Sequence, residues 1–351
     1  MSGSAARTTT ADVVCLGESM VTFLPSQPGR LADVPSFGRG IGGAESNVAC
    51  ALAADGHRAR WISRVGADGF GDHLVDTIDG YGVDTSAVRR DPDRPTGIYF
   101  RTATDRATDT HEVAYYRAGS AASAMSPDNV PMEDVLSTRV LHLSGITAAL
   151  SAECLALLNT LTAPREGRPV ISFDVNHRPG LWRGSEEGPE VLLALARRCD
   201  LVFVGDDEAE EAWGLHGAEA IRAALPEPEV LVVKRGADGV TVFSRTAGDG
   251  GDTVTTVPSL RVDVVAAVGA GDAFAAGFLS ATLRDVPVRD RARHGHLMAA
   301  AVLTVPGDLT DPPPRAYADR LAALDDTAWG TLRLGPGWTA AEGAYEEVPV
   351  R

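Results

Sequence analysis

Short apolar segments alternate with longer helical patterns along most of the chain, and this alternation restricts the possible folds more than any other feature. Each apolar segment begins or ends near a turn residue, which is typical of fully buried parallel strands. These segments span residues 13–17, 140–145, 169–174, 200–205 and 229–236. Helical patterns lie between them, at residues 44–56, 70–82 and 151–163. The repeat of strand and helix predicts an α/β fold with a doubly wound, mainly parallel sheet and helices on both of its faces.

Two regions interrupt the alternation. Residues 21–40 and 96–118 carry strand and hairpin patterns with no helix between the strands. We therefore expect a small β-sheet that projects from the main domain as a lid. The length of 351 residues fits one large domain with such an addition. In this division residues 1–11 are a disordered N-terminus, 12–311 form the α/β domain, and 312–351 form one C-terminal helix followed by an irregular extension.

The acidic composition limits the partners of the chain. Aspartate and glutamate number 48 against 32 lysines and arginines, and the formal net charge is −16. Nucleic acids and anionic membranes both require basic surface, so we expect neither as a partner. No apolar run reaches the roughly 18 residues that span a bilayer, and the first residues lack the apolar core of a signal peptide, so we expect a cytoplasmic protein. The spacing of the four cysteines fits neither a zinc site nor a disulfide framework.

The stretch VGAGDAFAAGF (268–278) places Gly269, Ala270 and Gly271 directly before Asp272 and an apolar helical pattern. Unpaired backbone N–H groups at a helix start can hold the negative charge that grows on a transferred phosphoryl group, and only small residues let the backbone approach so closely. Asp272 can accept a proton from an attacking hydroxyl at the same place. This pattern favours an anion hole with a base beside it, while a tight turn capped by Asp272 is the simpler alternative.

A second glycine-rich stretch, GIGGAESNVACALAADG (40–56), precedes another helical pattern. Gly42 and Gly43 can bring the backbone against a ligand, and the Asn47 amide can donate to and accept from hydroxyl groups. A loop that only turns before a helix would show the same pattern.

Together the two stretches resemble the two signatures of the ribokinase-like (PfkB) sugar kinase family. The first matches through GGAESNVA with Gly56 and Gly66, the second through GAGDAFAAGF, and the resemblance covers about residues 13–307. It implies the ribokinase-like fold and an ATP-dependent kinase of a sugar hydroxymethyl group, with Asp272 as the base and residues 269–271 as the anion hole. It also implies ATP and Mg²⁺ as cofactors, with Mg²⁺ held through water and phosphates and not by direct protein ligands.

Within the family, GESMVTFLP, TGIYFR, YYRAGSAAS and DVNHRPGLW resemble the 2-keto-3-deoxygluconate kinases. Thr22 stands where ribokinases and fructokinases usually carry an aspartate. The resemblance implies contacts with an acid sugar, and an arginine fork suits a carboxylate while tyrosine offers a hydroxyl and an apolar face. Ordinary packing of the tyrosines and solvation of Arg178 are the alternatives. The expected substrate-binding residues are Gly42, Gly43, Asn47, Tyr99, Tyr115, Arg117 and Arg178.

The nucleotide and Mg²⁺ side of the site is expected at Glu208, Lys234, Gly236 and Gly239. A solvated helix acid is the alternative for Glu208, and a plain hairpin turn is the alternative for the two glycines. The chain departs from the family pattern at two positions. Ala266 replaces an aspartate that helps many relatives to hold a monovalent cation, which predicts a weak response to K⁺, and Gly205 replaces the asparagine of an Asn-x-x-Glu element.

Three functions remain open from the sequence. The leading hypothesis is an ATP-dependent 2-keto-3-deoxygluconate kinase in which the lid excludes water. The second is a fructokinase or another sugar kinase of the same family, and the third is a non-catalytic sugar or nucleotide sensor. Exposed lid strands also favour pairing of two copies into a homodimer.

Overall fold

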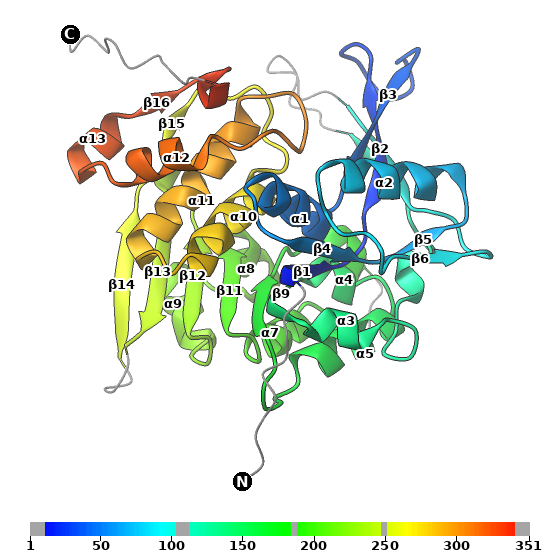
Figure 1. Cartoon of the computed structure of the whole chain (residues 1–351), viewed down its shortest axis with the longest axis horizontal. Helices are drawn as coiled ribbons and strands as arrows, with labels where there is room; N and C mark the ends of the chain where they lie inside the picture. Colours follow the sequence, from blue (N-terminus) through cyan, green and yellow to red (C-terminus); the bar gives the residue numbers. More distant parts are fainter. Residues whose placement is uncertain (1–10, 103–111, 184–187, 247–250, 341–351) are drawn as a thin grey trace.

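The computed structural model describes residues 11–102, 112–183, 188–246 and 251–340. An eight-stranded sheet runs through it in the order β14-β13-β12-β11-β10-β9-β1-β4 (Figure 1). Neighbours from β12 to β4 pair in parallel, whereas β13 and β14 are antiparallel additions at one edge. The predicted mainly parallel sheet is confirmed. Its strands are β1 (Ala11–Leu16), β4 (Ala59–Ile62), β9 (Thr138–Ser144), β10 (Val170–Asp174), β11 (Leu201–Gly205), β12 (Val230–Lys234), β13 (Val240–Arg245) and β14 (Asp252–Val257).

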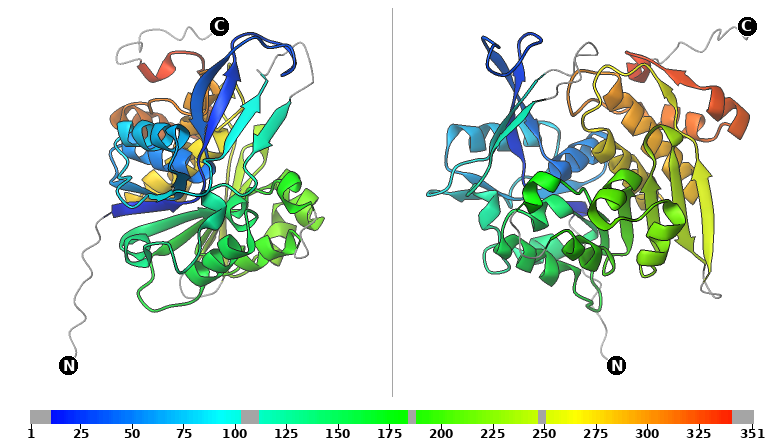
Figure 2. Two further views of the ribbon diagram at one scale, coloured as in Figure 1. Left: turned by 90° about the vertical axis from the view of Figure 1, so that its right-hand side faces the viewer. Right: turned by 180° about the vertical axis from the view of Figure 1, so that it is seen from behind.

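Helices cover both faces of this sheet (Figure 2). Strand β1 shows why, because side chains alternate along a strand. Val13 and Cys15 belong to the apolar core on one face, and Val14 and Leu16 belong to the core on the other. The first face carries α1 (Ala44–Ala54), α10 (Ala270–Leu283) and α11 (Val288–Leu303). The second carries α5 (Ala152–Thr162), α7 (Glu190–Ala196), α8 (Asp206–Trp213) and α9 (Ala218–Ala224), so the sheet is doubly wound as predicted.

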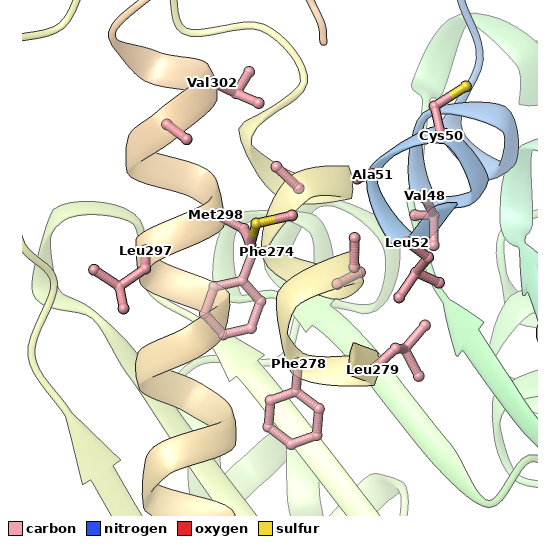
Figure 3. Packing of buried hydrophobic residues seen from close by; sticks show 14 of the residues in the cluster. Val48, Cys50, Ala51, Leu52, Phe274, Phe278, Leu279, Leu297, Met298 and Val302 are labelled. Carbon is pink, nitrogen blue, oxygen red and sulfur yellow. The ribbon is translucent and has the colours of Figure 1, made fainter. Parts of the chain in front are cut away.

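Helix α10 is fixed in place by apolar contacts along its length (Figure 3). Phe278 packs edge-on against Phe203 of the sheet, with ring centroids 5.5 Å apart. Gly277 lets α10 approach α11 closely, since a Cβ there would lie 2.4 Å from the carbonyl oxygen of His294. The first turn of α10 is therefore held on a rigid support.

A separate small sheet projects from the main domain (Figure 1). Its order is β3-β2-β7-β8, and it comprises β2 (Met20–Pro25), β3 (Phe37–Gly42), β7 (Ile98–Arg101) and β8 (Val113–Tyr116). The β2–β7 pair is parallel and the other two pairs are antiparallel. The predicted small sheet is thus present. Residues 103–111 of the predicted lid segment and 1–10 of the predicted disordered N-terminus lie outside the described residues, and Ala11 already belongs to β1.

The C-terminal segment differs from the prediction of one helix and an irregular extension. It forms α12 (Arg315–Ala322), α13 (Asp326–Thr331), the 3₁₀ turn η3 (Trp338–Ala340) and β16 (Arg333–Leu334), which pairs with β15 (Arg261–Val262). A second helix begins because the Asp325 side chain accepts a hydrogen bond from the Ala328 amide, as an N-cap does. Trp329 and Trp338 are buried in the main core, so the described part of this segment belongs to the α/β domain.

The remaining elements connect these layers. They are β5 (Arg64–Gly66), α2 (Gly69–Gly80), β6 (Arg89–Asp91), η1 (Ala122–Ala124), α3 (Met132–Leu136), α4 (Gly145–Ala148), α6 (Pro179–Trp182) and η2 (Gly236–Asp238). Among the described residues, every helix is too short or too polar to cross a membrane.

Candidate active site

A cavity of about 710 Å³ opens at the carboxyl ends of the parallel strands, between them and the small sheet. Ligands bind at this edge in open α/β folds, because loops from several strands converge there. We call it the strand-end cavity. All the residues predicted for the site line it except Gly236 and Gly239; those that do are Gly42, Gly43, Asn47, Tyr99, Tyr115, Arg117, Arg178, Glu208, Lys234, Gly269, Ala270, Gly271 and Asp272.

The start of α10 forms one wall of the cavity. Gly269 precedes the helix with φ of +79°, a left-handed conformation that favours glycine. A Cβ at this residue would also lie 2.6 Å from the carbonyl oxygen of Asp308, so no larger side chain fits. The first backbone N–H groups of any helix lack acceptors within the helix. Those of α10 therefore border the cavity with partial positive charge, as the predicted anion hole requires.

Asp272 lies in the first turn of α10, and its Oδ2 accepts a hydrogen bond of 2.8 Å from Asn47 Nδ2 on α1. Burial raises the pKa of Asp272 to about 7. The hydrogen bond from Asn47 opposes this rise, the Asp174 carboxylate adds to it, and Lys234 also opposes it. A carboxylate in this environment can exchange a proton near neutral pH, as a general base must.

Lys234 and Asp174 form an ion pair at the ends of two strands. Lys234 Nζ lies 2.9 Å and 3.1 Å from the two carboxylate oxygens of Asp174. Lys234 was among the residues predicted from the sequence, but Asp174, Asn176 and Asp308, which all line the cavity, were not. The signal for Asp174 was available, because it is the last residue of a buried strand and points to the edge where ligands bind.

The small sheet contributes aromatic and charged groups to the cavity. Tyr99 is buried and donates a hydrogen bond of 3.3 Å to Asp308 Oδ2, and burial raises the pKa of its hydroxyl. Arg101 on the same strand forms an ion pair of 2.7 Å with Asp308 Oδ1, with both side chains buried. Tyr115 is 53% exposed, so it faces the open part of the cavity. Gly42 must be small, because a Cβ there would lie 2.3 Å from the Tyr99 hydroxyl.

The two arginines expected to bind a carboxylate differ in their surroundings. Arg117 already forms an ion pair with Glu18, a buried residue that follows β1 and was not predicted for the site. Arg178 is half exposed, and its Nη1 lies 3.4 Å from Glu208 Oε1. The structure therefore brings Arg178 beside a residue predicted for the nucleotide, while Arg117 lies among residues from the small sheet.

Glu208 and the predicted glycine turn have local partners. Glu208 Oε2 accepts a hydrogen bond of 2.9 Å from the Gly205 amide, so this carboxylate caps its own helix. Gly236 and Gly239 lie outside the cavity, in the turn between β12 and β13. A Cβ at Gly239 would lie 2.1 Å from the carbonyl oxygen of Val257, so this glycine serves close packing. Their role toward the nucleotide stays a prediction, with the plain hairpin turn as its alternative.

Two buried oxygens in the cavity wall have no hydrogen-bond partner among the described residues. They are Oδ1 of Asn47 and Oδ1 of Asn176. Unpaired buried polar atoms are unfavourable. Both oxygens could accept hydrogen bonds from the hydroxyl groups of a bound ligand or from water molecules around a bound cation. Across the described ranges, no group of three or more His, Cys, Asp or Glu side chains is arranged to hold a metal ion directly.

The profile of the pfkB family carbohydrate kinases matches residues 10–315. The chain belongs to this family of carbohydrate kinases. The kinase is 35% identical over 310 residues to the 2-dehydro-3-deoxygluconokinase of Bacillus subtilis, covering 87% of the chain and 93% of the relative. It is 33% identical over 316 residues to the enzyme of that name from Thermoproteus tenax, covering 89% and 94%. The crystal structure of a PfkB protein from Polaromonas superposes with a TM-score of 0.76 at 32% identity, over 90% of this chain and all of that one.

These likenesses establish the class of reaction. The kinase is a phosphotransferase that acts on a carbohydrate, and its fold is the ribokinase-like fold that the two signature stretches implied. 2-Dehydro-3-deoxygluconate is another name for 2-keto-3-deoxygluconate, so the subgroup resemblance and these relatives agree.

Proposed function

We propose that this kinase transfers the terminal phosphoryl group of ATP to the terminal hydroxymethyl group of 2-keto-3-deoxygluconate. The observation that carries the proposal is the position of Asp272 at the start of α10. There a carboxylate whose pKa is about 7 lies beside the anion hole and inside a cavity that also holds arginines for an acid sugar. The names of the relatives support the same substrate.

In this mechanism Asp272 accepts the proton of the sugar hydroxyl as its oxygen bonds to the terminal phosphorus. The bond from that phosphorus to the bridging oxygen breaks, and ADP leaves with that electron pair. The first N–H groups of α10 hold the negative charge on the transferred group. Asn47 keeps the Asp272 carboxylate oriented through its 2.8 Å hydrogen bond.

When bound, Mg²⁺ would neutralise part of the negative charge of the phosphate groups. Asn176 and Glu208 both line the cavity. The unpartnered Oδ1 of Asn176 and the carboxylate of Glu208 would hold the water molecules around Mg²⁺. The small sheet acts as the lid in this proposal and excludes water, which would otherwise compete with the sugar for the phosphoryl group.

The preference for an acid sugar is assigned to Arg117 and Arg178. A charge-assisted hydrogen bond to a carboxylate contributes about 1.5–3 kcal/mol, and a neutral sugar cannot form this bond. Arg178 has the more accessible guanidinium, because its side chain is half exposed whereas that of Arg117 is largely buried beside Glu18.

The test is the ratio of kcat/KM for 2-keto-3-deoxygluconate to kcat/KM for fructose. We expect a high ratio in the wild type and a fall of about ten- to a hundredfold in Arg178→Ala, using about 1.4 kcal/mol per factor of ten. Arg183→Ala is the matched control, because Arg183 is an exposed residue on the same segment outside the cavity. A wild-type ratio near one would leave a sugar kinase of another specificity, such as a fructokinase, and remove the acid-sugar assignment.

We also propose that the kinase forms a homodimer through the strands of the small sheet. Strand β8 is an edge strand with two exposed tyrosines, which supports this pairing. We also propose a cytoplasmic location for the kinase, which its proposed use of ATP favours.

A further inference from the structure

Lys234 is the only lysine among the 32 lysine and arginine residues of the chain. Arginine occupies the other 31 positions of this type. Lysine differs from arginine in carrying a compact point charge, whereas the guanidinium is a larger planar fork. The position of this lysine is the strand-end cavity.

We propose that Lys234, positioned by Asp174, binds the terminal phosphoryl group of the nucleotide at the start of α10, and that arginine cannot replace it there. The proposal rests on the proposed use of ATP but not on the identity of the sugar. In it Lys234 contacts the substrate, and Asp174 is a positioning residue that acts through Lys234.

Geometry brings the ammonium group to the anion hole. Lys234 Nζ lies 3.8 Å from the point that a Cβ on Gly271 would occupy, so it faces the backbone that is expected to hold the phosphoryl group. The carboxylate of Asp174 occupies one side of Nζ through contacts of 2.9 Å and 3.1 Å. An ammonium group has three donors. Two directed at Asp174 leave the third for an oxygen in the cavity.

Asp174 keeps this cation in place and charged. Its own side chain is only 4% exposed, so it is a buried anchor and not a mobile surface acid. Burial lowers the pKa of Lys234, but the Asp174 and Glu208 carboxylates more than offset this, and the net shift of its pKa is upward. The ammonium therefore stays protonated between turnovers, ready for an anionic group.

The charge of the cavity favours a cation at this position. Asp174, Asp272, Glu208 and Asp308 all line it, and four carboxylates would repel a polyphosphate. Lys234 sits nearest to the backbone that receives the transferred group, whereas Arg178 is half exposed at the Glu208 side. If Lys234 served only to neutralise Asp174, its ammonium group would not need to face the cavity.

A single lysine allows a direct test. Selective ¹⁵N labelling of lysine gives one side-chain ammonium signal, which reports on Lys234 without overlap. We expect the Mg²⁺ complex of a non-hydrolysable ATP analogue to shift this signal clearly and Mg-ADP to shift it much less. Equal shifts from both nucleotides would overturn the proposal while leaving nucleotide binding intact. If neither nucleotide bound at all, the proposed use of ATP would fail as well.

Variants supply the second arm of the test. Lys234→Arg should weaken binding of the ATP analogue at least tenfold by calorimetry and change ADP binding less than twofold. Arg235→Ala is the matched control, because it removes the neighbouring positive charge outside the cavity, and it should leave both affinities unchanged. An analogue affinity in Lys234→Arg equal to that of the wild type would refute the requirement for lysine. The labelled wild type needs no variant, so it decides the proposal even if Lys234→Arg does not fold.

The role of Asp174 has its own readout. Asp174→Asn should weaken the response of the Lys234 signal to the analogue, because the amide no longer provides the two carboxylate contacts of 2.9 Å and 3.1 Å that hold the ammonium group. An unchanged response in Asp174→Asn would show that Asp174 does not position Lys234.

Discussion

At the scale of single residues, the site depends on a carboxylate that is neither fully solvated nor fully neutralised. Asp272 is partly buried, one amide donates to it, and a cation and a second carboxylate lie within electrostatic range. Burial alone would favour the protonated form of Asp272, whereas the Asn47 amide and the Lys234 ammonium group favour the ionised form. The balance leaves a base whose pKa is near the pH at which it is proposed to work.

Asp272→Asn should lose turnover by about a hundredfold or more, the usual scale for a general base, because an amide of nearly the same shape cannot accept the proton. Steady-state kcat on the best substrate gives the loss. Nucleotide affinity by calorimetry should stay close to that of the wild type. Turnover near that of the wild type would remove Asp272 from the role of base.

The dependence of activity on pH follows from the same residue. Asp272 is active when ionised, and its pKa is about 7, so kcat/KM for the sugar should rise as pH increases through this region and level off above it. The measurement uses saturating Mg-ATP, with the pH varied at constant ionic strength. A flat profile from pH 5 to pH 8 would contradict a raised pKa.

At the scale of elements, one buried ion pair joins the small sheet to the main domain. Arg101 on β7 contacts Asp308, which follows α11, at 2.7 Å. The backbone of Asp308 also lies against Gly269 at the start of α10. One loop therefore touches both the proposed lid and the predicted anion hole.

Removing one partner of this pair should destabilise the fold strongly, because it leaves a buried charge without its counterion. The usual cost is about 3–5 kcal/mol. In urea unfolding, Arg101→Met and Asp308→Asn should each lower the free energy of unfolding, and the double variant should lose less than the sum of the two. The exposed pair of Arg90 and Asp72 is the control, and Arg90→Met should cost about 1 kcal/mol or less. Losses at Arg101 and Asp308 that add within about 0.5 kcal/mol would show no coupling.

Elements that depend on local pattern were predictable from the sequence. The central strands and the helix whose first turn holds Asp272 are encoded by short runs of neighbouring residues. Contacts between distant segments were not predictable in this way. Arg101 with Asp308, and Arg117 with Glu18, join residues far apart in the chain, and nothing in either local sequence selects the partner. The second C-terminal helix was missed because its N-cap, Asp325, lies within an otherwise continuous helical pattern.

At the scale of the whole molecule, association must overcome the repulsion of two acidic chains with a formal net charge of −16 each. An exposed apolar edge offers the needed contact. Tyr116 on β8 is 64% exposed, and its ring meets Phe100 edge-on at 6.0 Å, so an aromatic cluster extends to the edge of the small sheet.

Sedimentation should therefore find a homodimer, and Tyr116→Arg should convert it to a monomer, since a charge on an edge strand opposes pairing. Val254→Arg is the matched control. Val254 is 54% exposed on β14, the edge of the large sheet, and its replacement should leave the dimer intact. A wild-type monomer, or a dimer lost only in Val254→Arg, would exclude pairing through the small sheet.

The place of Lys234 also decides how this protein can be attached to other molecules. Apart from the α-amino group at the start of the chain, the strand-end cavity holds its only primary amine. Dyes and resins that couple to amines therefore have two targets, one at the end of the chain and one inside the cavity. Near neutral pH the α-amino group, with a pKa of about 7.7–8.0, loses its proton more readily than a lysine does. Coupling under that condition would yield molecules held in one orientation with an open cavity, and coupling in strong base would block it.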